Sequence, residues 1–312
     1  MNGVLIIDKP AGWTSHDVVN RVRRILNQRS VGHLGTLDPM ATGVLPLVTG
    51  NFTRLAQFYL ASEKTYEGTI RFGFATDTYD AEGSPTTDPQ DVSIKREEVE
   101  SMATRFRGVI KQMPPPFSAK KIHGVPAYKL ARKQKEVVLQ AVEVEIKEFE
   151  ILETESCRAR FRARVASGTY MRSVAHDMGK ALGCGGHLEA LRRTSVAEFS
   201  LNEAHTMESL AENCHPDRSY PFPEEKDSGV EGRYVPQTEE FFIHPRKLLP
   251  HFPSVTADEP TVARIRAGRA VNLLDVSRSP QVKVFAGQRD LIAIATRVAG
   301  TLFHPKIVLC GQ

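Results

Sequence analysis

The segment GHLGTLDPMATGVLPL at residues 32–47 contains one carboxylate, Asp38, whose neighbours favour a defined backbone geometry. The proline after Asp38 biases it toward extended backbone, and the flanking glycines allow a tight turn. A carboxylate held in this way can act as a nucleophile if its surroundings keep it ionised. A turn carboxylate that accepts hydrogen bonds from its own backbone would have the same local sequence. The segment alone does not decide between these roles, because no second acid accompanies Asp38 in it.

Two other segments carry side chains that could complete a site around Asp38. KTYEGTIRF places Tyr66 at the start of a strand pattern, and SGTYMRS places Tyr170 and Arg172 at the start of a helical pattern. An arginine near a buried aspartate keeps the carboxylate ionised and fixes its orientation. A buried tyrosine is more often part of a core than of a catalytic site, so both roles stay open for the tyrosines.

A basic stretch with interleaved aromatic residues, FSAKKIHGVPAYKLARKQK at residues 117–135, contains no acid. Lys129, Arg132 and Lys133 lie in it close to Tyr128, a composition that attracts phosphate backbones. A solvated surface helix would have the same composition, so this alternative stays open.

The run CRARFRARV predicts a strand with four arginines on one face, Arg158, Arg160, Arg162 and Arg164. Glu143 and Glu145 of the preceding alternating run can lie opposite some of these arginines in an antiparallel ladder. The alternative is an arginine face that meets RNA.

The elements that position these residues mix strands and helices without a regular βαβ order. Strands are predicted at residues 4–7, 44–49 and 66–74 and in two runs within 142–165, and helices at 15–26, 53–61 and 169–182. We expect Ser15 to cap the first helix. GCGG at residues 183–186 follows a helix rather than a strand, so it predicts a helix end and not a dinucleotide-binding loop.

The composition indicates a soluble globular chain of one large and one small domain. The chain has 312 residues, of which 41% are hydrophobic, and 41 Lys and Arg against 37 Asp and Glu give a net charge of +4. This balance suggests, without requiring, a polyanionic partner. The cysteines, Cys157, Cys184, Cys214 and Cys310, have no metal-binding spacing and are interpreted as reduced thiols. No leader or membrane segment is recognised, and we expect a cytoplasmic protein.

The domain boundary is expected near residue 245. Residues 215–240 are rich in Pro, Gly and acids and predict an exposed linker or insertion. Short apolar runs after it predict a small all-β module at 250–312. The larger domain then comprises residues 1–245, with a basic insertion at about 110–150.

Six ordered segments between residues 9 and 199 resemble the TruB family of bacterial tRNA pseudouridine synthases. They are KPAGWTSHD, GHLGTLDPMATGVLPL, YEGTIRFGFATDTYDAEG, QMPPPFSAKKIHGVPAYKLAR, SGTYMRSVAHDMG and HLEALRRTSVAEF. Phe117 and Ala197 depart from the tyrosine and glycine that are common at these positions.

The resemblance implies an α+β fold, with a mixed-sheet catalytic core and a small C-terminal β-rich module similar to PUA domains. It implies isomerisation of uridine 55 in the tRNA T-loop to pseudouridine by base flipping and an aspartate nucleophile, without metal or other cofactor. Asp38 would be the nucleophile and Arg172 its ion-pair partner. The remaining implied site residues are Tyr66, which would stack on uracil, Tyr170 and Leu191, which would wall the pocket, and His33, which would occupy the region vacated by the flipped nucleotide.

The implied partner is the T-stem-loop of tRNA, and we expect a monomer with no obligate protein partner. Two other classes of protein stay open. One is an RNA-binding folding factor without chemistry, against which the set of Asp38, Tyr66 and Arg172 argues. The other is a base-exchanging transglycosylase or nucleoside hydrolase, which would release free base.

Overall fold

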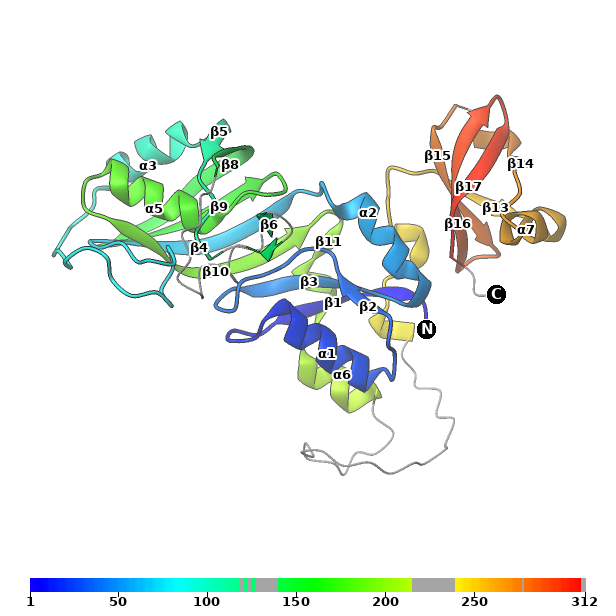
Figure 1. The fold of residues 1–312 in the computed structure, drawn as a ribbon, viewed down its shortest axis with the longest axis horizontal. Helices are drawn as coiled ribbons and strands as arrows, with labels where there is room; N and C mark the ends of the chain where they lie inside the picture. Colours follow the sequence, from blue (N-terminus) through cyan, green and yellow to red (C-terminus); the bar gives the residue numbers. More distant parts are fainter. Residues whose placement is uncertain (118–120, 123–124, 127–139, 215–238, 277, 310–312) are drawn as a thin grey trace.

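Two separate sheets organise the computed structural model of the chain (Figure 1). The structure describes residues 1–312 except 118–120, 123–124, 127–139, 215–238, 277 and 310–312. Lys129, Arg132 and Lys133 of the basic stretch lie outside the described residues, as does most of the predicted linker at 215–240. In the described part of the chain, no helix combines the length and the apolar character needed to span a membrane.

The larger sheet is mixed, which confirms the predicted α+β fold with a mixed-sheet core. Its strands are, in spatial order, β12 (Ala204–His205), β1 (Gly3–Lys9), β3 (Thr42–Thr49), β10 (Gly186–Val196), β4 (Lys64–Phe72), β9 (Arg158–Val165), β8 (Val142–Glu155) and β5 (Gly108–Gln112). β2 (Val31–His33) pairs with β3, and β11 (Phe199–Ser200) pairs with β10. The β1–β12 and β3–β10 pairs are parallel, and the other pairs are antiparallel.

Helices cover one face of this sheet. They are α1 (Ser15–Ile25), α3 (Arg96–Arg105), α5 (Met171–Ala181) and α6 (Met207–Cys214), and α1 and α6 lie side by side (Figure 1). Alternate residues of β4, namely Tyr66, Ile70 and Phe72, are buried in the core between the sheet and these helices. The predicted helix at 53–61 was only partly right, because its first part is a 3₁₀ helix (Gly50–Leu55) that continues into the short α2 (Ala56–Tyr59). A small hairpin of β6 (Lys121–Ile122) and β7 (Val125–Pro126) lies outside both sheets.

The prediction that Ser15 caps α1 was wrong, because Thr14 does so. The Thr14 hydroxyl accepts a hydrogen bond from the Asp17 N–H, and the Asp17 carboxylate accepts one from the Thr14 N–H. Ser15 is the first helical residue and is buried, and its hydroxyl accepts from the Leu37 N–H at 2.8 Å and donates to the Leu37 carbonyl at 3.1 Å. Ser15 therefore ties α1 to the residue before Asp38.

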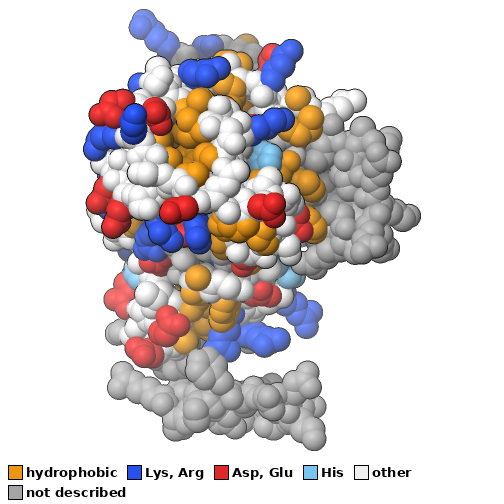
Figure 2. Space-filling model, turned by 90° about the vertical axis from the view of Figure 1, so that its left-hand side faces the viewer, with side chains coloured by type: hydrophobic (Ala, Val, Ile, Leu, Met, Phe, Trp, Pro, Cys, Tyr) orange, Lys and Arg blue, Asp and Glu red, His pale blue; other side chains and the backbone are white. Residues whose placement is uncertain are grey.

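The arginine face of β9 carries cross-strand ion pairs, but Glu143 and Glu145 do not provide them. Those two glutamates lie opposite β5 in the register of β8. Each arginine instead pairs with another glutamate: Arg158 with Glu189, Arg160 with Glu153, Arg162 with Glu67, and Arg164 with Glu63 and Glu148. Acidic and basic side chains are likewise interspersed on the face drawn in Figure 2. The ion pairs account for the arginine pattern without an RNA contact.

The C-terminal module is β-rich, as predicted, but it is not all β. Its sheet has the order β13 (Ser254–Ala257), β15 (Gln281–Ala286), β16 (Asp290–Ala299), β17 (Leu302–Val308) and β14 (Val271–Asn272). Packed against it is α7 (Glu259–Arg266), which the strand patterns missed. Asp258 caps this helix by accepting from the Thr261 N–H, and Gly268 follows its end with φ of 71°.

The module is fixed to the larger sheet by an apolar cluster and by buried polar contacts. The cluster joins β1 residues such as Ile6 to Phe285 and Ile307 of the module. Glu198 accepts a hydrogen bond from the Leu249 N–H at 2.8 Å. From the module side, Lys283 donates to the Leu248 carbonyl at 2.6 Å. The segment that contains Leu248 and Leu249 is therefore hydrogen-bonded both to the larger domain and to the module.

Candidate active site

Asp38 lies in the loop between β2 and β3, and this loop is held by Arg193 of β10. Arg193 is only 1% exposed and donates to the carbonyls of Gly35, Thr36 and Val44 at 3.0, 3.2 and 2.8 Å. Gly43, with φ of 100°, allows β3 to approach β10, because a Cβ there would lie 2.2 Å from the Arg193 carbonyl oxygen. The backbone on both sides of Asp38 is thus fixed before any ligand binds.

Arg172 binds the Asp38 carboxylate with two nitrogens. Its Nε lies 2.9 Å from Oδ2 and its Nη2 donates to Oδ1 at 3.0 Å. Arg172 is 4% exposed and also donates to the carbonyls of Thr78 and Phe117. A guanidinium held at this many points fixes both the charge and the orientation of Asp38.

A second acid, Asp80, lies in the same ion-pair network, although the sequence indicated no second acid beside Asp38. Asp80 is buried, and its Oδ2 lies 3.4 Å from Arg172 Nη1. Its Oδ1 accepts from the Thr78 hydroxyl at 2.5 Å and from the Glu82 N–H at 3.1 Å. Asp80 belongs to the loop after β4, where the segment DTYD gave a pair of acids but no indication of which one points inward. Arg172 therefore lies between two carboxylates.

The surroundings shift the pKa of Asp38 upward. Burial has the largest effect and Asp80 adds to it, while Arg172 and Lys9 oppose it. Lys9 is itself buried, which lowers its pKa to about 8, and its ammonium group donates to the carbonyls of Pro10, Trp13 and Pro39. Lys9 thus fixes the loop just after Asp38. The ionisation of Asp38 depends on keeping Arg172 in contact with it.

Asp38 opens into a cavity of about 250 Å³ on the helix-covered side of the sheet. The structure brings Tyr66, Tyr170, Leu191 and Arg172 together around this cavity. Tyr66 and Leu191 are each 8% exposed, and Tyr170 is fixed by two backbone hydrogen bonds to the Gln112 amide. The cavity offers a carboxylate, an aromatic ring and apolar walls, which suit a planar heterocycle next to a nucleophile. Its other lining residues are Gly35, Thr36, Leu37, Lys64, Ala166, Ser167, Gly168, Thr169, Met171 and Arg193.

His33 does not line this cavity. It ends β2, and its Nδ1 accepts a hydrogen bond from the Gly35 N–H at 3.3 Å. Burial and the nearby Arg193 lower its pKa, which favours the neutral imidazole. His33 is therefore placed at the base of the Asp38 loop, beside the cavity rather than in it.

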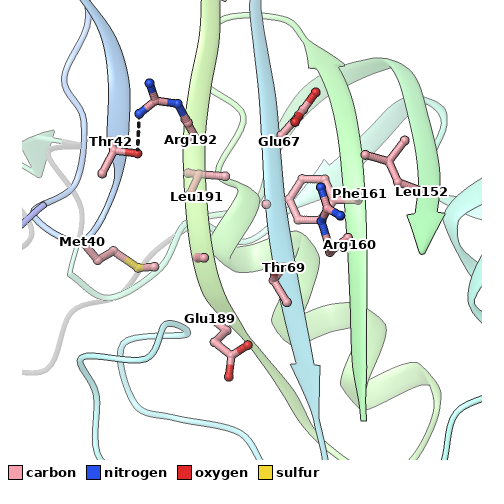
Figure 3. A pocket seen from close by; sticks show the side chains of 12 residues that line it. Met40, Thr42, Glu67, Thr69, Leu152, Arg160, Phe161, Glu189, Leu191 and Arg192 are labelled. Carbon is pink, nitrogen blue, oxygen red and sulfur yellow. Dashed lines mark hydrogen bonds between the residues drawn. The ribbon is translucent and has the colours of Figure 1, made fainter. Parts of the chain in front are cut away.

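A second cavity of about 300 Å³ lies on the opposite face of β4, β9 and β10 (Figure 3). Glu67 and Thr69, which alternate with the buried Tyr66 along β4, line it. Its charged side chains are already used, since Arg160 pairs with Glu153, Glu67 with Arg162, Glu189 with Arg158, and Arg192 with Asp8. We therefore place the chemistry in the Asp38 cavity.

In the described part of the chain, no group of three or more His, Cys, Asp or Glu is arranged to hold a metal ion.

Residues 23–171 match the family model described as TruB family pseudouridylate synthase, N-terminal domain, and residues 172–225 match the tRNA pseudouridylate synthase B C-terminal domain. A protein of Solibacter usitatus named tRNA pseudouridine synthase B is 47% identical over 312 residues, which cover 99% of this chain and 100% of that protein. A protein of the same name from Aquifex aeolicus is 44% identical over 222 residues, 70% of this chain and 76% of that protein.

Solved structures share the fold over nearly the whole chain. One, titled "Structure of H/ACA RNP bound to a substrate RNA containing 2'-deoxyuridine", superposes with a TM-score of 0.69 at 24% identity. Another, titled "Crystal Structure of a Cbf5-Nop10-Gar1 Complex", gives a TM-score of 0.68 at 25% identity. Each match covers 99% of this chain and 85% of the other.

Proposed function

Because the chain belongs to the TruB family and is a tRNA pseudouridine synthase, an isomerase that converts uridine in tRNA to pseudouridine, we propose that it acts on uridine 55 in the T-loop with Asp38 as its nucleophile. The observation that carries this proposal is the contact between Asp38 and two nitrogens of the buried Arg172 at the wall of an aromatic-lined cavity. This contact keeps a partly desolvated carboxylate ionised and correctly oriented.

The reaction breaks the bond between N1 of uracil and C1′ of ribose and forms a bond between C5 and C1′. Asp38 forms a covalent bond to the substrate at either C1′ or C6, and both points of attack need one ionised carboxylate. The uracil then turns, C5 bonds to C1′, and the bond to Asp38 breaks. The proton leaves C5 and N1 takes up a proton, so the base stays neutral. The isomerisation conserves mass, so free base is never released.

The target nucleotide leaves its stack before this chemistry, because the glycosidic bond is inaccessible in a folded T-loop. The flipped uracil stacks on Tyr66, and Tyr170 and Leu191 form the walls around it. The Tyr66 hydroxyl is also our candidate for the base that removes the C5 proton, directly or through a water. His33, at the base of the Asp38 loop, occupies the region that the flipped nucleotide leaves.

RNA contacts outside the cavity come from two further regions in this proposal. Lys129, Arg132 and Lys133 contact phosphates of the T-arm. In the module at 250–312, Lys and Arg outnumber Asp and Glu by eight to four, an excess equal to the net charge of +4 of the whole chain. We assign residues 1–245 to the catalytic domain and 250–312 to an RNA-binding module. We also propose that the protein works in the cytoplasm as a monomer without cofactor or obligate protein partner.

The test is incubation of the full-length protein with an unmodified tRNA transcript, followed by chemical mapping of pseudouridine. We expect modification at uridine 55 and no change in the mass of the RNA. Modification at another position would contradict the assigned target. Release of free uracil would indicate a hydrolase or transglycosylase, and binding without any product would indicate a folding factor.

A further inference from the structure

Lys64, the first residue of β4, is a buried cation in the Asp38 cavity that the chemistry above does not use. Its side chain is 9% exposed and lines the cavity, and its ammonium group donates one hydrogen bond, to the Ser62 carbonyl at 2.6 Å. Among the described residues, none forms an ion pair with it. Burial and the nearby Arg193 lower its pKa to about 8.

The charges that surround Lys64 leave positive charge uncompensated at this end of the cavity. Lys64 Cε lies 3.7 Å, and Arg193 Nη1 3.6 Å, from the position that a Cβ of Gly35 would occupy. Both cationic side chains therefore pack against Gly35. Arg193 uses its donors on three backbone carbonyls. Asp38, the acid of this cavity, is already bound by Arg172. Lys64 therefore has ammonium protons left for a ligand.

The acidic residue next to Lys64 in the sequence does not form an ion pair with it. Glu63, the adjacent residue, points to the outer face of the sheet, where it binds Lys147 and Arg164. A buried ammonium group without a counterion is destabilising, so an anion brought by a ligand would be favoured at this position.

We propose that Lys64 binds the phosphate that adjoins the flipped uridine. This inference rests on the proposed function, because it takes the uracil to stack on Tyr66. Lys64 and Tyr66 alternate on one strand, so their Cα atoms are about 6.6 Å apart on the same face, a separation comparable to that between the base and a phosphate of one nucleotide. A phosphate carries a full negative charge, whereas the uracil carbonyls carry partial charges. The phosphate therefore complements the unpaired ammonium group better.

The experiment combines a protein variant with a chemically modified RNA. Binding of a T-arm minihelix is measured for full-length Asp38→Asn protein with and without Lys64→Met, so that no turnover interferes. The minihelices carry either natural linkages or one neutral methylphosphonate, placed 5′ or 3′ to the target uridine. Met keeps the length of the side chain and suits a buried position, and Lys64→Arg restores the charge. Lys180→Met, at the exposed end of α5, is the matched control.

We expect Lys64→Met to weaken binding of the natural RNA about tenfold or more, as for a lost charge-assisted hydrogen bond. The plot of log K against log salt should flatten by about 0.7, the value for one phosphate contact with a single strand. One of the two methylphosphonates should weaken binding to Lys64-containing protein by a similar factor and have little further effect on Lys64→Met. Lys64→Arg should retain most of the affinity, and Lys180→Met should bind like its parent.

The proposal would be overturned if each methylphosphonate weakened RNA binding equally for the Lys64-containing and the Lys64→Met protein. Such a result would show no coupling between Lys64 and a phosphate. A second contradiction would be unchanged binding together with a slower single turnover at saturating RNA when Lys64→Met is placed in the protein that retains Asp38, which would place the charge of Lys64 on the reacting uracil. If Lys64→Met folds poorly, Lys64→Gln serves as the uncharged variant in the same comparison of natural and methylphosphonate RNA. Failure of the proposed function appears separately, as absence of product from the wild-type protein.

Discussion

Replacing Arg172 tests how much of the site depends on one buried guanidinium. Arg172→Ala would leave Asp38 and Asp80 facing each other without the cation that binds both. Arg172→Lys would keep a positive charge but lose the planar fork. Three of the arginine nitrogens contact the two carboxylates, and two of these nitrogens also reach the Thr78 and Phe117 carbonyls.

The expected magnitudes follow from this geometry. Removing one partner of a buried ion pair destabilises a protein by about 3–5 kcal/mol. We expect the lower end, about 3 kcal/mol, because the Asp38 side chain is 33% exposed to the cavity. At roughly 2 °C per kcal/mol for a chain of this size, the melting temperature should fall by about 6 °C. Loss of the aimed carboxylate should slow single turnover by about 100-fold or more, which is the cost of a displacement of about 1 Å.

The assay is single-turnover conversion of T-arm RNA at saturating enzyme across a range of pH. Asp38 reacts as the carboxylate, so the rate falls as pH falls through its pKa. Arg172 lowers that pKa, and Arg172→Ala should therefore move the acid limb to higher pH. Arg192→Ala is the matched control, because Arg192 also binds one carboxylate, Asp8, with two nitrogens but is half-exposed outside the cavity. A wild-type rate for Arg172→Lys would refute the positioning role.

Three further predictions concern neighbouring groups. Asp80→Asn removes a charge that raises the pKa of Asp38, so its acid limb should move to lower pH in the same assay, and an unmoved limb would mean that Asp80 acts only structurally. Tyr66→Phe should bind tRNA normally but lose release of tritium from C5-labelled uridine. Tyr66→Leu should also lose about 1–3 kcal/mol of binding free energy. Tritium release at the wild-type rate by the Phe variant would mean that Tyr66 only stacks on the base. Neutralising Lys129, Arg132 and Lys133 together should weaken tRNA binding and flatten its salt dependence, and an unchanged slope would assign the segment to a solvated surface.

The local elements of this site could be predicted from the sequence, because short-range patterns encode them. The turn at Asp38 ahead of the strand at 44–49 and the helix that begins after Tyr170 were both predicted, whereas the short β2 before the turn was not. Thr14 was passed over as a helix cap in favour of Ser15, although Asp17 three residues later completes a capping box. Pro260 and Gly268 similarly marked both ends of α7.

What the sequence could not supply is long-range register and burial. Glu143 and Glu145 alternate correctly, yet the pairing of β8 places later glutamates opposite the arginines. Asp80 reaches Arg172 only because the loop after β4 folds back against α5, and nothing local distinguishes it from Asp77, which is exposed. The local sequence around Lys64 is that of an ordinary strand lysine, and its burial depends on the distant loop that contains Gly35.

Pseudouridine formation by Asp38→Asn tests most directly whether Asp38 is the nucleophile. Asparagine keeps the shape of the side chain and removes the nucleophile, so the variant should bind T-arm RNA within about tenfold of wild type, roughly 1.4 kcal/mol. Chemical mapping after single turnover should find pseudouridine at position 55 with the wild-type protein and none with the variant. Measurable product from Asp38→Asn would contradict the assignment of Asp38 as the nucleophile.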